Sequence, residues 1–263
     1  MYQFPGFRYN ILMRWIYISP HFDDAVLSCG GLIFEQSRQG IPVEIWTICA
    51  GDAPPGPLSP LAQVCHFQWG TQTAAETVAL RTEEDGRAAA ILGAATCHFS
   101  IADCIYRRDA EGELLYTEEV FVPRHPLEAG LDREIAAVLD EELRPDDLLV
   151  CPLTIGGHLD HILTRDAVER LGRPLQYPMQ YYADIPYLLD HPEAFAPATL
   201  GLMDELLPVT EEGLSAWLDG IAAYKSQMKM LFESEEKMRG AIRKYWADRR
   251  GVRLWRKIPP QTA

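Results

Sequence analysis

A short apolar stretch that stops abruptly at charged residues is the feature that most constrains the fold. Trp15–Ser19 (WIYIS) is rich in β-branched and aromatic side chains, which predicts a buried strand, and Pro20 ends it. Apolar residues then recur at near-helical spacing over residues 25–39, which predicts a helix. Gly30 and Gly31 are poor helix formers, so we expect this helix to pack tightly on the strand before it.

The same alternation of strands and helices continues along the chain. It predicts a Rossmann-like α/β fold: a mostly parallel, doubly wound sheet with helices on both faces and a helical C-terminal segment. We expect irregular structure over 183–208. The expected strands after the first are 42–49, 95–101, 147–153 and 176–182, and the expected helices after the first are 61–69, 74–92, 127–143, 162–171 and most of 210–247.

Length and composition are typical of one ordinary globular domain. With 263 residues, 48% hydrophobic and 24% charged, we expect a single domain over 1–263, with a core at about 14–185 and a helical extension at about 208–257. No run of eighteen apolar residues is present, so we expect no membrane span. The six cysteines form no CxxC pair, and we interpret them as reduced thiols of a cytoplasmic protein.

Charge is unevenly distributed along the chain. The net charge of −14 argues against nucleic-acid binding, yet residues 237–257 hold nine Lys and Arg against one acidic residue, Asp248. This basic segment could dock on the acidic body, on a neighbouring subunit of a homo-oligomer or on an anionic partner. A solvated basic helix packed on its own domain is the interpretation we favour.

Two polar clusters occur where predicted strands end. His21, Asp23 and Asp24 follow the first strand, and His158 and His161 follow the strand at 147–153. Imidazole and carboxylate suit Zn²⁺ or a similar divalent ion, whereas the alternative for the first cluster is a helix N-cap beside a hydrogen-bonded loop histidine. Because the carboxyl ends of parallel strands meet at one edge of a sheet, two such clusters together favour a metal site.

These motifs, in this order, resemble the LmbE-like, or PIG-L, family of zinc-dependent N-deacetylases. The stretch PHFDDAVLSCGG is similar to the family motif Ala/Ser-His-Pro-Asp-Asp-Glu, and HLDH is similar to His-x-Asp-His. RTEEDGRAAAILG, from Arg81 to Gly93, is similar to the family's Arg-x-x-Glu helix that ends in Leu-Gly. The resemblance extends from Ile16 to about Ala167, and more loosely to YYADIPY (181–187) and YKSQ (224–227).

The resemblance implies hydrolysis of the acetamide of an N-acetylated amino sugar or glycoconjugate, of the N-acetylglucosaminide type, to acetate and a free amine. The small-molecule substrate would be an amino sugar, and Zn²⁺ would be the cofactor. Fe²⁺ is an alternative, because the same ligand types accept both metals. By the same resemblance His21, Asp24 and His161 hold the metal and Asp23 is the general base; His158 assists the oxyanion or the departing amine, Asp160 orients a histidine, and Arg81 and Asp103 hold sugar hydroxyls.

The sequence also departs from the family pattern. Phe22 replaces the motif's proline, Ala25 replaces its glutamate, and Gly156 stands where some members have a tyrosine, for which Tyr182 or Tyr187 could compensate.

Two other functions and two structural roles stay open. A Rossmann-like enzyme that binds a nucleotide or S-adenosylmethionine is disfavoured, because no G-x-G-x-x-G follows the first strand. The other alternative is a non-catalytic sugar-binding relative. Arg81 could instead pair with Glu84 on a helix face, and Asp103 could be an ordinary turn residue.

Overall fold

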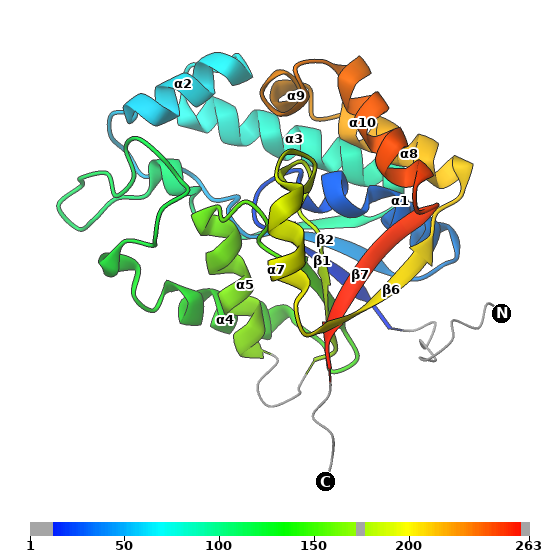
Figure 1. Ribbon diagram of the computed structural model, residues 1–263. Coiled ribbons are helices and arrows are strands. Elements are labelled where there is room, and N and C mark those ends of the chain that lie inside the picture. Colours follow the sequence, from blue (N-terminus) through cyan, green and yellow to red (C-terminus); the bar gives the residue numbers. More distant parts are fainter. Residues whose placement is uncertain (1–12, 172–176, 259–263) are drawn as a thin grey trace, which may run out of the picture.

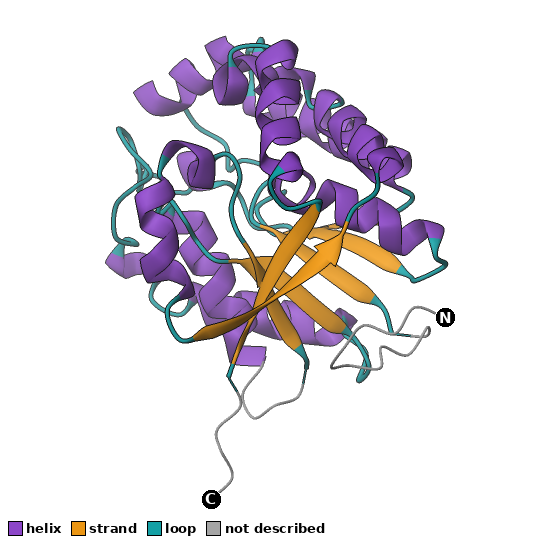
Figure 2. Ribbon diagram, turned by 45° about the vertical axis from the view of Figure 1, so that its right-hand side comes forward, coloured by secondary structure: helices purple, strands orange, loops and turns teal. Residues whose placement is uncertain are grey.

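A twisted, mostly parallel sheet forms the centre of the computed structural model, which describes residues 13–171 and 177–258 (Figures 1 and 2). Within these residues the strand order is β3-β2-β1-β4-β5-β7-β6, and the first five strands of this order run parallel. Strand β7 is antiparallel to both of its neighbours. The strands are β1 (Trp15–Ser19), β2 (Val43–Thr47), β3 (Ala95–His98), β4 (Leu148–Pro152), β5 (Met179–Tyr182), β6 (Leu202–Pro208) and β7 (Gly251–Lys257).

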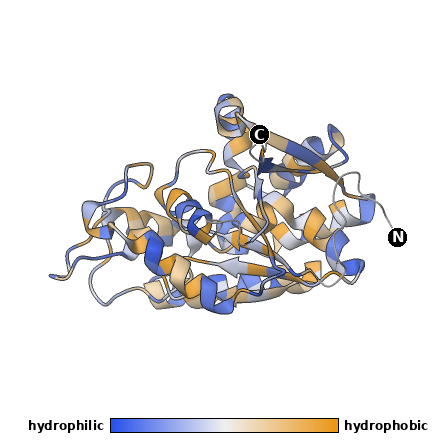
Figure 3. Cartoon of the chain, turned by 90° about the horizontal axis from the view of Figure 1, so that it is seen from below, coloured by the Kyte–Doolittle hydropathy of each residue, from blue (hydrophilic) through white to orange (hydrophobic). Residues whose placement is uncertain are grey.

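Helices cover both faces of the sheet, as the sequence predicts. Side chains of β1 alternate between the two layers: Trp15 and Tyr17 enter one core cluster, and Ile16 and Ile18 enter the other. Most helices combine apolar and polar residues, as expected for helices that cover a sheet and face solvent (Figure 3). The first cluster is shared with α1 (Asp24–Arg38), α3 (Ala74–Leu92), α8 (Glu211–Ala222), α9 (Lys225–Phe232) and α10 (Glu235–Ala247), and the second with α4 (Leu131–Glu142), α5 (Leu159–Leu171), α6 (Tyr187–Asp190) and α7 (Phe195–Thr199).

Local sequence signals explain where two consecutive helices begin and end. Ser59 caps α2 (Pro60–Trp69), and Thr73 caps α3, each by accepting a hydrogen bond from a backbone N–H. Gly70 and Gly93 end these helices in the left-handed conformation that glycine adopts without strain. Helix α2 packs beside a short 3₁₀ helix, Cys104–Tyr106, in a third and smaller apolar cluster.

The sequence interpretation needs correction in several places, among them the start of α4 at Leu131 and not at residue 127. Residues 183–208 are not irregular throughout, because they include the short helices α6 and α7 and a regular strand, β6. The basic segment is not helical to its end but continues from α10 into strand β7. Strand β6 is mostly exposed and lies at the edge of the sheet, so it lacks the apolar pattern of a buried strand. Helix α5 begins at Leu159, earlier than predicted, and strand β5 begins at Met179, while residue 176 lies outside the described residues.

The basic segment is docked on the acidic body of its own chain. Arg250 pairs with Glu211, Arg253 with Asp204, and Lys257 with Glu169, at 2.6 to 2.9 Å. Arg239 likewise contacts Asp219 at 2.9 Å. Of the three alternatives left open by the sequence, the structure therefore shows the intramolecular one.

The two glycines of α1 lie against Trp217 of α8 and against Val209 just before that helix, and not against the preceding strand. A Cβ atom on Gly30 would come within 2.5 Å of Trp217 Cδ1, and one on Gly31 within 2.8 Å of Val209 Cγ1. The close approach that these glycines predict is therefore real, but the partner is an element far along the chain.

Among the described residues, no helix is long and apolar enough to cross a membrane.

Candidate active site

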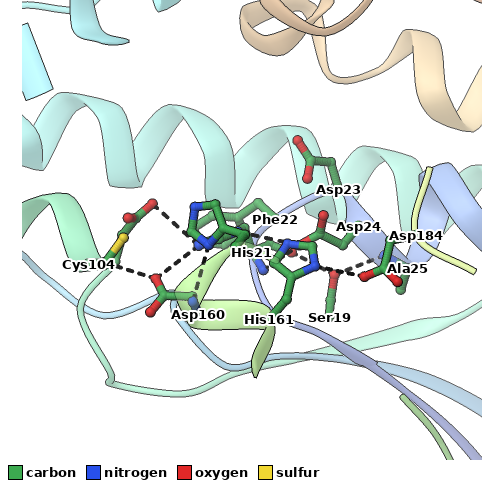
Figure 4. A network of polar contacts seen from close by, with 12 residues as sticks. Ser19, His21, Phe22, Asp23, Asp24, Ala25, Cys104, Asp160, His161 and Asp184 are labelled. Atoms are coloured by element: carbon green, nitrogen blue, oxygen red, sulfur yellow. Dashed lines mark hydrogen bonds and ion pairs between the residues drawn. The ribbon is translucent and has the colours of Figure 1, made fainter. Parts of the chain in front are cut away.

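The polar residues singled out in the sequence meet at the carboxyl edge of the parallel strands (Figure 4). The group His21–Asp24 follows β1, and His158 to His161 follow β4. Asp103 lies in the segment after β3, and Asp184 follows β5. This is the position where open α/β sheets bind ligands.

Each of two histidines is held by a buried carboxylate. His21 Nε2 lies 3.1 Å from Asp160 Oδ2, and His161 Nδ1 lies 2.8 Å from Asp184 Oδ1. A carboxylate only accepts hydrogen bonds, so these nitrogens carry the protons when the rings are neutral. The other nitrogens, His21 Nδ1 and His161 Nε2, then keep free lone pairs, which is the state in which histidine binds a metal.

Both lone-pair nitrogens lie beside the same oxygen of Asp24. Asp24 Oδ2 is 3.4 Å from His21 Nδ1 and 3.3 Å from His161 Nε2. Ligands of a tetrahedral ion with bonds of about 2.0–2.1 Å are separated by roughly 3.4 Å. His161 Nε2 is also buried without a hydrogen-bond partner in the described structure. The three side chains therefore fit a divalent cation.

His158 lies beside the two other histidines. Its ring centroid is 4.8 Å from that of His21 and 5.3 Å from that of His161. Burial and the neighbouring histidines hold the pKa of His158 well below its usual range, so the ring is neutral. Its Nδ1 accepts a hydrogen bond from the backbone N–H of Asp160 at 3.1 Å, which leaves the proton on Nε2 as a donor.

Asp23 has an unusual backbone conformation. Its φ of 115° lies in a region that only glycine adopts without strain, and such strain concentrates at functional sites. Its carboxylate lies outside the contact network of the histidines (Figure 4) and 3.5 Å from Arg81 Nη2. Burial raises the pKa of Asp23 to about 8, against the opposing attraction of Arg81.

Arg81 is fixed on several sides at once. Nη2 donates to the carbonyl of Phe22 at 3.0 Å, and Nη1 lies 3.9 Å from Asp103 Oδ2. Its guanidinium carbon is 5.1 Å from the Trp69 ring centroid and 5.5 Å from that of Phe22. Asp103 also serves the turn, because its Oδ1 accepts from the backbone N–H of Ile105 at 3.2 Å.

Glu84 is not the partner of Arg81. It accepts hydrogen bonds from the backbone N–H and the hydroxyl of Ser226, at 2.9 and 2.6 Å, and the neighbouring Asp85 accepts from Tyr224 at 2.6 Å. The YKSQ stretch thereby joins the C-terminal helices to α3. The two residues of the Arg-x-x-Glu pattern therefore make separate contacts: Arg81 points to Asp23 and Phe22, and Glu84 binds Ser226.

Of the two tyrosines considered for the space at Gly156, only Tyr187 lies there. A Cβ on Gly156 would come within 2.6 Å of the Tyr187 ring, whose centroid is 5.5 Å from that of His161. Tyr182 is fully buried and donates its hydroxyl to the carbonyl of Ile18 at 2.9 Å. Tyr187 therefore borders the site, and Tyr182 does not reach into it.

Sequence reasoning missed two charged residues of the site. Asp184 lies two positions after strand β5 and holds His161. The strand-end rule that located the other residues would have found it. Arg107 donates to Asp160 from the segment after β3, and no motif marks it.

Comparisons with known proteins agree with this geometry. Residues 16–171 match the family model described as PIG-L: GlcNAc-PI de-N-acetylase. The chain is 27% identical over 272 residues to a 2'-N-acetylparomamine deacetylase of Niallia circulans, covering 92% of this chain and 93% of that one.

Solved structures of deacetylases have the same fold. A deacetylase of teicoplanin biosynthesis matches with a TM-score of 0.77 and 30% identity over 92% of this chain and 97% of that chain. The zinc-inhibited form of teicoplanin deacetylase Orf2 has a TM-score of 0.76 and 28% identity over the same shares. The A40926 pseudoaglycone deacetylase Dbv21 has a TM-score of 0.70 and 26% identity, over 95% and 99%.

Proposed function

Because the chain belongs to the PIG-L, or GlcNAc-PI de-N-acetylase, family, we propose that it is a metal-dependent deacetylase of an N-acetylated amino sugar. One observation carries the metal dependence: two histidines, each held by its own carboxylate, direct their free nitrogens to one oxygen of Asp24. His21, Asp24 and His161 are the proposed ligands, and three protein ligands leave one position open, as in catalytic zinc sites.

The residues around the proposed metal site have separate roles in the proposed hydrolysis. A divalent ion at this site supplies Lewis acidity for the acetamide carbonyl and for water. Asp23 takes the proton of the attacking water, and its raised pKa suits a base that works near neutral pH. The Nε2–H of neutral His158 donates to the oxyanion, and the proton taken up by Asp23 passes to the departing amine. The C–N bond breaks to give acetate and the free amino sugar.

Arg81 and Asp103 are the proposed contacts of the sugar hydroxyls. They lie 3.9 Å apart, and Trp69 packs over the guanidinium. The exposed Phe121 ring, 5.6 Å from that of His158, adds an aromatic wall. The Niallia circulans relative is a deacetylase of 2'-N-acetylparomamine, so for this chain we propose an N-acetylglucosaminide-type sugar within a larger glycoside.

Zinc is the proposed metal, with Fe²⁺ as the alternative that the same ligand types accept. All six cysteines are free thiols, which supports the proposal of a reducing, cytoplasmic environment.

Metal content and acetate release test the proposal together. Elemental analysis of the wild type should give about one divalent ion per chain, and His161→Ala should lose it because it removes one of three ligands. His191→Ala, which changes an exposed histidine outside the site, should keep it. The metal-loaded wild type should release acetate from 2'-N-acetylparomamine or a simple N-acetylglucosaminide. A wild type that takes up no metal would overturn the proposal.

A further inference from the structure

A buried arginine lies behind the proposed metal ligands and has no part in the function described so far. Arg107 follows the 3₁₀ helix Cys104–Tyr106 and is only 7% exposed. Its Nη2 donates to Asp160 Oδ1, and its Nε lies 2.9 Å from Glu128 Oε1. One guanidinium thus joins two buried carboxylates.

Its partner Asp160 is fully buried and touches the first proposed ligand. Asp160 Oδ2 accepts from the backbone N–H of Cys104 at 3.0 Å and lies 3.1 Å from His21 Nε2. A buried carboxylate is costly unless it is paired and hydrogen-bonded. Arg107 supplies that pairing through Nη2, while its Nε faces Glu128, so the planar guanidinium is held between two carboxylates and fixes the position of Asp160 Oδ1.

The far end of this chain of contacts is also anchored. Glu128 Oε2 accepts from the Tyr116 hydroxyl at 2.7 Å, and the Tyr116 ring centroid is 5.7 Å from the guanidinium carbon of Arg107. Both residues belong to the segment between β3 and α4 that also carries Asp103. The other orienting carboxylate, Asp184, has no arginine partner among the described residues and accepts instead from the backbone N–H of Ile155.

We propose that Arg107 is a positioning residue that sets the metal affinity of the site by holding Asp160 against His21. The inference rests on the proposed function, because it takes His21 as a ligand. With Asp160 fixed, the ring of His21 has one orientation and presents Nδ1 toward Asp24. Loss of a partner that orients a ligand typically weakens metal binding by about 10–100-fold.

Zinc affinity of the metal-free protein, measured by competition with a chelator, tests the role of Arg107. Arg107→Met should bind zinc about 10–100-fold more weakly than the wild type. Arg107→Lys should fall between them, because an ammonium group cannot reach both carboxylates in the same way. Arg124→Met is the matched control: Arg124 lies on the same segment but pairs with Asp166 and Asp132, so wild-type affinity is expected.

A double variant separates positioning from general structural damage. If Arg107 acts through Asp160, then Asp160→Asn and Arg107→Met/Asp160→Asn should bind zinc equally. Melting curves by circular dichroism are recorded on every variant, since a merely structural role would lower the melting temperature and leave zinc affinity unchanged.

Each outcome decides for or against the proposal. Wild-type zinc affinity in folded Arg107→Met, or in Arg107→Lys if the methionine variant does not fold, overturns the role of Arg107 while the deacetylase function stands. Additive losses in the double variant overturn it too. A wild type that binds neither zinc nor Fe²⁺ overturns the metal-dependent function itself, and this inference with it.

Discussion

At the scale of single residues, Asp23 allows the proposed catalytic role to be tested apart from the proposed metal binding. It adjoins the proposed ligand Asp24, yet its carboxylate faces Arg81 and makes no hydrogen bond to the histidines in the described structure. A group that takes a proton but holds no metal should be removable without loss of the ion.

We therefore predict that Asp23→Asn retains its metal and loses turnover. The amide cannot accept the proton of water, so kcat should fall by about 10²–10⁴-fold. Asparagine tolerates positive φ better than most residues, so the strained backbone should persist and the variant should fold. Elemental analysis and acetate release on the same sample check both halves. Undiminished turnover with metal bound would exclude Asp23 as the base.

Residues differ in how far the sequence alone locates them. That His21, Asp24 and His161 meet was predictable, because all three follow parallel strands of one sheet. Their assignment as metal ligands came from the family resemblance and stays a proposal. Arg107 was not, because its importance depends on Asp160, which is 53 residues away in sequence. The sequence marked Arg81 through its motif. It did not predict that the guanidinium lies between the rings of Trp69 and Phe22, because that arrangement depends on the fold.

At the scale of elements, strong local signals were read correctly and weak ones were not. Strand β1 and helix α3 have the predicted bounds, since one is a continuous apolar run and the other has Thr73 and Gly93 at its ends. Strand β6 was missed because an exposed edge strand needs no apolar face. Strand β7 was missed because its basic residues, Arg253, Arg256 and Lys257, stand among buried apolar ones, and the count of charges alone does not reveal this.

The contact between α1 and α8 depends on the absence of a side chain at Gly30. Trp217 is fully buried against it, and its indole donates to the carbonyl of Val26 at 2.8 Å, so the ring cannot move away freely. Overpacking costs about 1–3 kcal/mol, part of which the better helix propensity of alanine offsets.

We predict opposite effects of alanine at two glycines. Gly30→Ala should lower the free energy of unfolding by about 1–2 kcal/mol. Gly86→Ala should raise it by up to about 1 kcal/mol, because Gly86 lies inside α3 and a Cβ there would meet nothing within 4 Å. Urea unfolding of both variants checks the signs. A Gly30→Ala protein as stable as the wild type would show that α8 can shift.

An ion pair between α4 and α5 should make stability depend on pH. Burial alone would raise the pKa of Asp132, but the hydrogen bond from Arg170 and the nearby Arg124 lower it below its usual value. Asp132 therefore contributes stability above its unfolded pKa of about 3.9, and this contribution is lost as the pH falls through the lower, folded value.

Asp132→Asn should consequently destabilise the protein at pH 7 and not at about pH 2. Arg170 is half exposed, so the loss at pH 7 should stay below about 1 kcal/mol. Glu141→Gln is the control on the same helix: Glu141 is exposed and forms no ion pair in the described structure, so its substitution should change little. Urea unfolding at both pH values tests this, and a difference that grows toward acid would contradict it.

At the scale of the whole molecule, the C-terminal extension is part of the core and not an appendage. Strand β7 lies between β5 and β6, α8 packs on α1, and hydrogen bonds from Tyr224 and Ser226 reach Asp85 and Glu84 on α3. The core at 14–185 and the extension at 208–257 are therefore successive segments of the sequence, and they do not form separate structural units. We propose that residues 1–263 form one domain and unfold as one unit.

A single unfolding transition is the corresponding prediction. The six tryptophans fall on both sides of the division, at positions 15, 46 and 69 and at 217, 246 and 255. Tryptophan fluorescence and far-UV circular dichroism should therefore give coincident urea curves, as two-state unfolding requires. Tyr224→Phe removes the hydrogen bond to buried Asp85, and it should move the whole transition to lower urea without splitting it. An early fluorescence change that leaves most helical signal intact would mean that the extension unfolds on its own, and the single-domain proposal would then be wrong.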